Sequence, residues 1–190
     1  RTANDPSDAD TGPNGRQNFP GFSAYTLAPS FDAADFTFNI DSVNTGSNYP
    51  MRVDFYRAIE DEPGQWLGST SCATSACSAS ISFPPAVTLT SSDIVLGVVT
   101  DANGKSSEAS FYATTLTITG DSPDPSTIGT QYTVTVTATS TDPFAPLGTI
   151  NVLDTAGNGC AGSLTRVSNG NSTASCAVNT TGAPGAVTIS

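Results

Sequence analysis

Short runs in which apolar and polar side chains alternate are the feature that most restricts the fold of this sequence. In "QYTVTVTATS", Tyr132, Val134, Val136 and Ala138 alternate with four threonines. This period of two predicts extended strands with one buried face, because successive side chains point to opposite sides of a sheet. Similar runs recur between turn signals about every 8–12 residues, a spacing typical of a β-sandwich.

The alternating runs form two series, which predict two sandwich domains. The first series, over residues 21–114, contains "ADFTFNID", "PMRVDFYR" and "DIVLGVVTD". In "PMRVDFYR" the apolar face carries Met51, Val53 and Phe55, and the opposite face carries Arg52, Asp54 and Tyr56. About seven strands are expected in this domain, near Tyr25, Phe36, Val53, Leu67, Ile81, Leu96 and Phe111.

The second series, over residues 115–190, predicts five or six strands, with Val187 and Ile189 of "GAVTIS" in the last of them, and the chain ends where a final strand should begin. A sandwich without its last strand has an open sheet edge. Two explanations stay open: the chain was cut at that point, or a neighbouring molecule supplies the strand by β-strand addition. Residues 1–20 have no apolar period and are predicted to be a turn-rich, acidic connector.

The charge of the chain excludes several classes of partner. The net charge is −11 over 190 residues, and Lys105 is the single lysine. Nucleic acids and anionic membranes are recognised through basic surfaces, so neither is an expected partner. No stretch has the roughly 18 apolar residues of a membrane span, and membrane insertion is not expected.

The four cysteines fall into two local pairs, which predict disulfides. Cys72 and Cys77 lie in "CATSAC", and Cys160 and Cys176 flank a predicted hairpin with "SNG" at its tip, whose equal arms would bring the two cysteines opposite each other. Zinc is the alternative, but the chain has no histidine. Disulfides indicate an oxidising compartment, so an extracellular or cell-surface location is expected.

Several motifs also resemble a known family. The run "LTITGDSPDPSTIGTQYTVTVTATS", then "PLGTINVLD" and the paired cysteines, resembles bacterial immunoglobulin-like surface-protein repeats. "VDFYRA…GQWLGST…TDANGKSSEAS" is similar to the sandwich module that follows a right-handed parallel β-helix in secreted bacterial proteins. "NDPSDADTGPNGRQNFP" resembles the junction before that module. The resemblance implies two tandem immunoglobulin-like Greek-key sandwiches, although such folds host many functions.

An acidic cluster near the N-terminus is a candidate calcium site. Asp5, Asp8, Asp10 and Asn14 offer oxygen ligands at short spacing, although the spacing is not that of an EF-hand. The alternative is a linker in which Asp and Asn side chains bond to the local backbone. No cofactor is required by the sequence, and a structural Ca²⁺ is the metal that this cluster suggests.

The remaining candidate residues favour binding over catalysis. Without histidine, the serines lack their usual base, and Lys105 lies in a predicted turn at Asn103-Gly104. No catalytic residue is assigned. Trp66, with Tyr25, Tyr49 and Tyr56, suggests a surface on which sugars stack, the alternative being that Trp66 covers the core or an edge.

The sequence therefore predicts a non-catalytic extracellular module. Its role would be that of a stalk, adhesive part or filament subunit of a bacterial surface or secreted protein, assembling through β-strand addition. The expected partners are neighbouring domains of the same or identical chains, or a host or matrix surface. The alternative is a carbohydrate-binding module of a secreted polysaccharide-active enzyme, with a glycan as its ligand.

Overall fold

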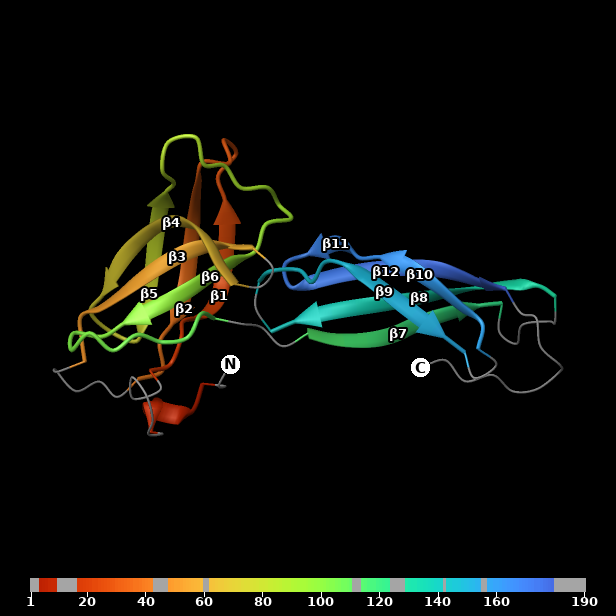
Figure 1. The fold of residues 1–190 in the computed structure, drawn as a ribbon, viewed down its shortest axis with the longest axis horizontal. Coiled ribbons are helices and arrows are strands. Elements are labelled where there is room, and N and C mark those ends of the chain that lie inside the picture. The colour runs from red at the N-terminus through yellow and green to blue at the C-terminus, as the bar shows by residue number, and fades with distance from the viewer. Residues whose placement is uncertain are drawn as a thin grey trace. The chain divides into compact units, whose positions relative to one another are not determined.

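The structure is a computed structural model, and in its described residues the regular elements are antiparallel β-strands and one short 3₁₀ helix (Figure 1). It divides into two compact units, Arg1–Tyr112 and Ala113–Ser190, and each is described by itself. The residues described are 4–9, 17–42, 48–59, 62–110, 114–123, 129–141, 143–154 and 157–179.

The first unit consists of two three-stranded sheets, in the orders β1-β2-β5 and β4-β3-β6. Six of the seven expected strands lie within the described residues, and Phe111, near which the seventh was expected, lies outside them. A short 3₁₀ helix, η1, precedes the strands. The elements are η1 (Pro6–Asp8), β1 (Gly21–Leu27), β2 (Ala33–Asn39), β3 (Met51–Ile59), β4 (Glu62–Cys72), β5 (Ala76–Ser82) and β6 (Val95–Thr100).

Aromatic rings from both sheets form the core of the first unit. Phe36 of β2 and Phe55 of β3 belong to different sheets, and their rings stack at a centroid distance of 4.6 Å. Phe22 of β1 contacts both rings, and Phe38 meets Phe55 edge-on. Because the strands alternate, each of these rings points inward while its neighbours along the chain point outward.

The N-terminal stretch is hydrogen-bonded to the first unit. Asn4 and Phe19 exchange two bonds, since the Asn4 amide donates to the Phe19 carbonyl at 2.8 Å and accepts from the Phe19 N–H at 3.0 Å. Asp5 and Asn18 are joined in the same way. The Asn18 side chain also donates to the carbonyl of Asp41, just beyond β2. Residues 4–9 and 17–20 are therefore held against the first unit.

Gly97, in the middle of β6, is a point of close approach. A Cβ atom at this position would lie 2.4 Å from the Pro20 ring, so the N-terminal stretch fits only over a glycine.

Residues 107–110 run along the edge of β6 that does not pair with β3. Ser110 donates its N–H to the Gly97 carbonyl, and Ser107 donates to the Val99 carbonyl, each at 2.8 Å.

The second unit contains a four-stranded sheet, β11-β12-β8-β7, and a two-stranded sheet, β10-β9. The pairing of β8 with β12 is regular from Gln131↔Asn179 to Thr139↔Asn171. The strands are β7 (Thr114–Ser122), β8 (Gln131–Ser140), β9 (Thr149–Leu153), β10 (Gly159–Ser163), β11 (Thr165–Ser168) and β12 (Asn171–Asn179). "GAVTIS", which was predicted to form a strand with Val187 and Ile189, lies outside the described residues.

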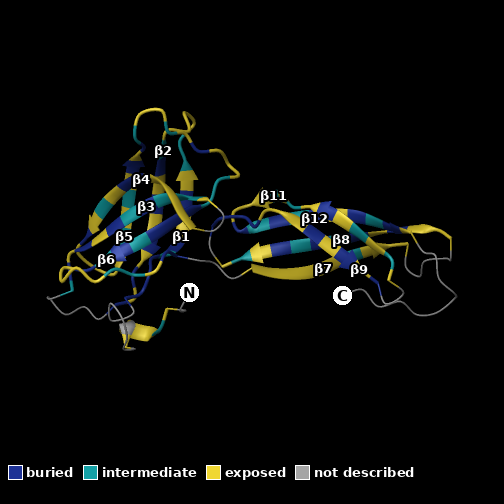
Figure 2. Cartoon of the chain, in the orientation of Figure 1, coloured by how far each residue is buried: buried dark blue, intermediate teal, exposed yellow. Residues whose placement is uncertain are grey.

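The core of the second unit lies between β8 and β12 on one side and β9 and β10 on the other. On β8, buried and more exposed residues alternate as the sequence predicted (Figure 2). The buried residues are Tyr132, Val134, Val136, Ile150, Val152, Ala174, Cys176 and Val178.

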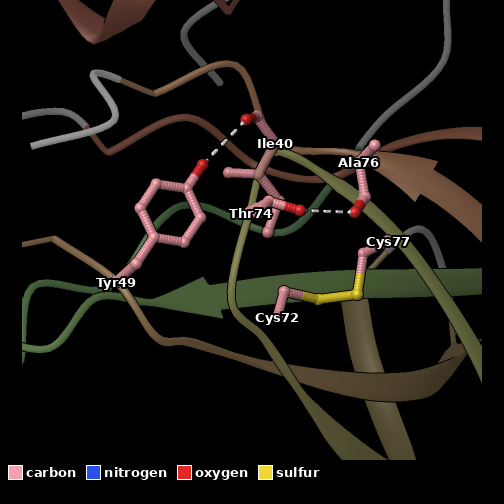
Figure 3. Close-up of a disulfide and its surroundings, with 6 residues drawn as sticks. All are labelled: Ile40, Tyr49, Cys72, Thr74, Ala76 and Cys77. Carbon is pink, nitrogen blue, oxygen red and sulfur yellow. Dashed lines mark hydrogen bonds between the residues drawn. A yellow bond between two sulfur atoms is a disulfide. The ribbon is translucent and has the colours of Figure 1, made fainter. Parts of the chain in front are cut away.

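Both predicted cysteine pairs are disulfides, and each joins the two sheets of its unit. Cys72 ends β4 and Cys77 lies on β5, so their bond spans the tight turn between the sheets (Figure 3). The turn is also held by the Thr74 hydroxyl, which donates to the Ala76 carbonyl at 3.0 Å. Beside it, the Tyr49 hydroxyl reaches the Ile40 carbonyl.

The predicted geometry of the second pair was wrong. The hairpin tip does lie at Asn169-Gly170, but the hairpin consists of β11 and β12 alone. The chain enters the sheet of this hairpin only after Leu164. Before Leu164, β10 pairs with β9 in the other sheet. Cys160 therefore faces Cys176 across the core, not across a hairpin.

Two loops, one in each unit, have the same hydrogen-bonding pattern. In "DANGK" the Asp101 N–H donates to the Lys105 carbonyl, and the Asp101 carboxylate accepts the Lys105 N–H at 2.8 Å. In "DTAGN" Asp154 and Asn158 make the same two contacts. Gly104 and Gly157 have φ values of 80° and 86°, which favour glycine. The expectation of a turn at Asn103-Gly104 is confirmed.

Replacing Phe55 by alanine tests the aromatic core. We expect a loss of about 3–5 kcal/mol in the free energy of unfolding of the first unit, because a large inward ring is removed from a packed site. Denaturant unfolding followed by the emission of Trp66, the single tryptophan, measures this loss. Phe31→Ala, which alters an exposed ring, is the matched control and should change stability far less. An equal loss in both variants would contradict this account of the core.

Replacing Asp101 by alanine tests the loop. The carboxylate accepts the N–H groups of Asn103 and Lys105, so its removal leaves two donors without their partner. We expect the first unit to lose about 1–3 kcal/mol of stability in denaturant unfolding. Asp101→Asn keeps one acceptor oxygen and should lose less. Equal stability of the alanine variant and the parent protein would show that the loop bonds do not matter.

Candidate functional site

Four side chains gather on the outer face of the sheet β4-β3-β6, and we call them the outer-face cluster. They are Arg52, Asp54 and Tyr56 of β3 and Trp66 of β4. Tyr56 and Trp66 are directly paired in the strand register, so they share one face of the sheet. The Trp66 side chain remains 42% exposed, which is a large apolar surface to leave in water.

Asp54 lies at the centre of the outer-face cluster. Its Oδ1 atom accepts a hydrogen bond from the Trp66 indole N–H at 3.0 Å and one from Arg52 at 2.7 Å. The Asp54 side chain is 13% exposed, whereas that of Arg52 is 61% exposed. The carboxylate is therefore held between two donors, and the indole ring is fixed by its only polar atom.

The electrostatics of the cluster follow from this arrangement. Burial raises the pKa of Tyr56, and the negative charge of Asp54 raises it further, while Arg52 partly offsets the effect. The hydrogen bond to Asp54, followed by its charge, raises the pKa of Arg52. The cluster thus places the Tyr56 phenol, whose pKa is raised, beside the Arg52–Asp54 ion pair.

A bulge in β4 determines which way Trp66 points. Phe55 pairs with Gly68 and Tyr56 pairs with Trp66, so Leu67 is an extra residue in the ladder. Leu67 is buried, and a Cβ atom at Gly68 would lie 2.5 Å from the Ile81 side chain. Two consecutive residues thus face inward, and Trp66 is directed outward.

Sequence reasoning identified Trp66, left open whether it covers the core or contacts a ligand, and did not assign Arg52 or Asp54 to a site. The alternation in "PMRVDFYR" was the available signal, because it places Arg52, Asp54 and Tyr56 together on one face. Two other aromatic residues considered with Trp66, Tyr25 and Tyr49, are buried and are not part of the cluster.

The acidic N-terminal candidates are only partly within the described residues. The Asp5 carboxylate accepts the N–H of Ala9 at 2.8 Å. Asp10 and Asn14 lie outside the described residues, and so does the side chain of Asp8. Among the side chains that the structure describes, no group of three acidic, histidine or cysteine residues is placed to hold a metal ion.

The described part of the second unit leaves one side of its larger sheet uncovered, and we call this the open side. Leu116 and Ile118 of β7 pair with Ala138 and Val136 of β8, so all four side chains share the inward face of the sheet. Ala138 and Val136 are buried, but Leu116 is 57% exposed and Ile118 is 41% exposed. Figure 2 shows β7 coloured mostly as exposed. The two-stranded sheet covers β8 and β12 but does not extend over β7.

A shallow hollow of about 390 Å³ lies at one end of the first unit. Its lining contains one carboxylate, that of Asp32, which accepts a hydrogen bond from the Ser30 hydroxyl. Phe31 and Ala86 beside it have positive φ angles of 63° and 67°. The other lining residues, Ala33, Ser82, Phe83, Pro84, Pro85, Val87 and Thr88, bring no second ionisable group to this hollow.

The sequence matches no family model, and no curated protein or solved structure matches it. Among the described residues, no helix has the length and apolar character needed to cross a membrane.

The raised pKa of Tyr56 generates a pH prediction. At a pH between the ordinary phenol pKa of 10.0 and the higher pKa of folded Tyr56, the folded chain keeps the phenol proton that the unfolded chain loses. This contribution to stability is complete below pH 10 and is lost as the pH rises through the folded pKa. Tyrosine NMR titration should show that Asp54→Asn lowers the Tyr56 pKa and leaves the raised pKa of Tyr132, in the second unit, unchanged. An unaltered Tyr56 pKa in this variant would contradict the role of Asp54.

Proposed function

We propose that this chain is a non-catalytic structural or adhesive module of an extracellular bacterial protein, built from two immunoglobulin-like sandwiches. We propose further that it associates by adding a β-strand at the open side of its second unit. The single observation that carries this proposal is the exposure of Leu116 and Ile118 on the inward face of a sheet whose inward side chains on β12, and on β8 from Tyr132 to Ala138, are buried.

The open side has the two properties that strand addition requires. First, β9 pairs with β10 along one edge, and the described residues place no strand along its other edge. An unpaired edge presents N–H and C=O groups to an incoming extended chain. Second, Leu116 and Ile118 provide apolar contacts for alternate side chains of that chain. Backbone pairing would supply affinity, and the apolar contacts would fix the register.

The occupant that we propose is an extended segment of a second copy of this chain. The chain is rich in alternating apolar and polar runs, such as that of β8, which fit an edge of this kind. Its net charge of −11 opposes association through like-charge repulsion, and salt screens that repulsion. Association should therefore strengthen as ionic strength rises, which is the opposite of an assembly driven by charge pairs.

The extracellular location is supported by the two disulfides. Both join sheets within a unit, and bonds of this kind persist in oxidising compartments. They are compatible with a secreted protein, and they would keep the two sheets of each unit joined outside the cell.

Replacing Ile118 by lysine tests strand addition. Sedimentation velocity over a wide range of protein concentrations should show association of the parent protein that strengthens with salt. Ile118→Lys should weaken it by at least about tenfold, because a charge would be buried in the new contact. Val167→Lys is the matched control, since Val167 is an exposed apolar residue of the same unit on β11. It should leave association unchanged.

Two results would contradict this function. One is a parent protein that stays monomeric at high concentration and high salt. The other is protection from hydrogen exchange, in the dilute monomer, of the β9 amides that point away from β10, because that edge would then already be paired within one chain.

A further inference from the structure

We propose that the outer-face cluster of the first unit binds a neutral saccharide chain, with the Trp66 ring as the surface on which a pyranose stacks. This inference goes beyond the proposed function and does not depend on it, because it concerns β3 and β4 of the first unit. Strand addition concerns β7 and β9 of the second.

The state of the Trp66 ring is the first argument. Tryptophan offers a large, rigid contact surface, and little side-chain freedom is lost when it binds a partner. Here that freedom is already reduced, because the indole N–H is bonded to Asp54 at 3.0 Å. With its polar atom engaged, the exposed part of the ring offers an apolar face. The C–H face of a sugar ring is the complementary surface.

The polar groups around the ring are the second argument. The Oδ1 atom of Asp54 accepts both bonds within the cluster, and Oδ2 takes part in neither. The guanidinium of Arg52 reaches solvent and has five N–H donors, only some of which contact Asp54. Ser69 and Ser71 pair with Asp54 and Arg52 on β4, and both are exposed. Acceptors, donors and hydroxyls thus border an apolar ring, as recognition of sugar hydroxyls requires.

The charge of the site favours a neutral sugar over an acidic one. The positive charge of Arg52 is balanced by Asp54 at 2.7 Å. The whole chain carries a net charge of −11, which repels uronate and sulfate groups. A charge-balanced site in an acidic protein is suited to a ligand that presents hydroxyls without ionic groups.

The shape of the site favours a sugar over a proline-rich peptide. Such peptides dock in grooves between aromatic rings. The outer-face cluster lies on the face of a sheet, where Tyr56 and Trp66 are adjacent cross-strand residues. The hollow at Ser30 and Asp32 lies elsewhere and contains none of the cluster residues. A sugar ring that stacks on the exposed Trp66 ring fits this surface better than a groove-binding peptide does.

The single tryptophan makes the proposal directly measurable. Trp66 emission reports this site and no other, because the chain contains no second indole. We would titrate the parent protein with neutral hexasaccharides of β-1,4-glucose, β-1,3-glucose, β-1,4-N-acetylglucosamine and β-1,4-mannose. At least one should shift the emission to shorter wavelength and show saturable binding by calorimetry.

Substitutions then identify the groups that bind. Trp66→Ala should raise the calorimetric Kd by at least about tenfold, as removal of a central tryptophan does at other interfaces. Arg52→Gln changes a side chain that is 61% exposed and should fold normally, so it tests the site even if Trp66→Ala unfolds. It should weaken binding by several-fold. Phe31→Ala, an exposed ring outside the cluster, is the matched control and should bind as the parent does.

Three results would overturn the proposal. The first is the absence of any change in emission or heat with all four neutral hexasaccharides. The second is tighter binding of a polyuronate or a proline-rich peptide than of any neutral sugar. The third is binding that survives both Trp66→Ala and Arg52→Gln. Ile118→Lys should bind sugar as the parent does, so failure of strand addition and failure of saccharide binding are separate results.

Discussion

The packing of two sheets through their inward side chains is the constraint on which both units depend. In the first unit it takes the form of the Phe36–Phe55 stack, in which one ring comes from each sheet. Phe22 packs against both of these rings and Phe38 packs against that of Phe55, so aromatic side chains from both sheets fill the space between them. Because Phe55 points inward, its two neighbours along β3 must lie on the outer face of the sheet. Asp54 and Tyr56 reach the outer-face cluster for that reason.

The sequence predicted which side chains are buried better than it predicted which strands are neighbours. Alternation correctly placed Phe36, Val53 and Val134 in the cores, since it depends only on the geometry of a single strand. The position of a strand within a sheet depends on its partners, and one chain segment does not specify them. The error over Cys160 and Cys176 arose in this way. Equal hairpin arms are a local criterion, whereas at Leu164 the chain passes from one sheet to the other.

The position of Trp66 shows a second limit of local reasoning. A strict period of two would place Trp66 and Gly68 on the same face, yet they point to opposite faces because Leu67 is an extra residue in the ladder. A bulge is a relation between two strands, and here it is made possible by the lack of a side chain at Gly68, beside Ile81. Alternation along β3 was enough to place Arg52, Asp54 and Tyr56 on one face. The position of Trp66 required the register between β3 and β4.

The disulfide of the second unit helps to explain how the inward face of β7 can be left uncovered in its described part. In the second unit the Cys160–Cys176 bond joins β10 to β12, on the side of the core that is covered. Leu116 and Ile118 lie on β7, at the other edge of the four-stranded sheet. A covalent link between the sheets limits the freedom of the unfolded chain, and so it offsets apolar contacts that this half of the core lacks. The covered half can then stay folded while the inward face of β7 is exposed. The disulfide therefore acts together with the apolar core between β8, β12, β9 and β10, and both hold the two sheets of this unit together.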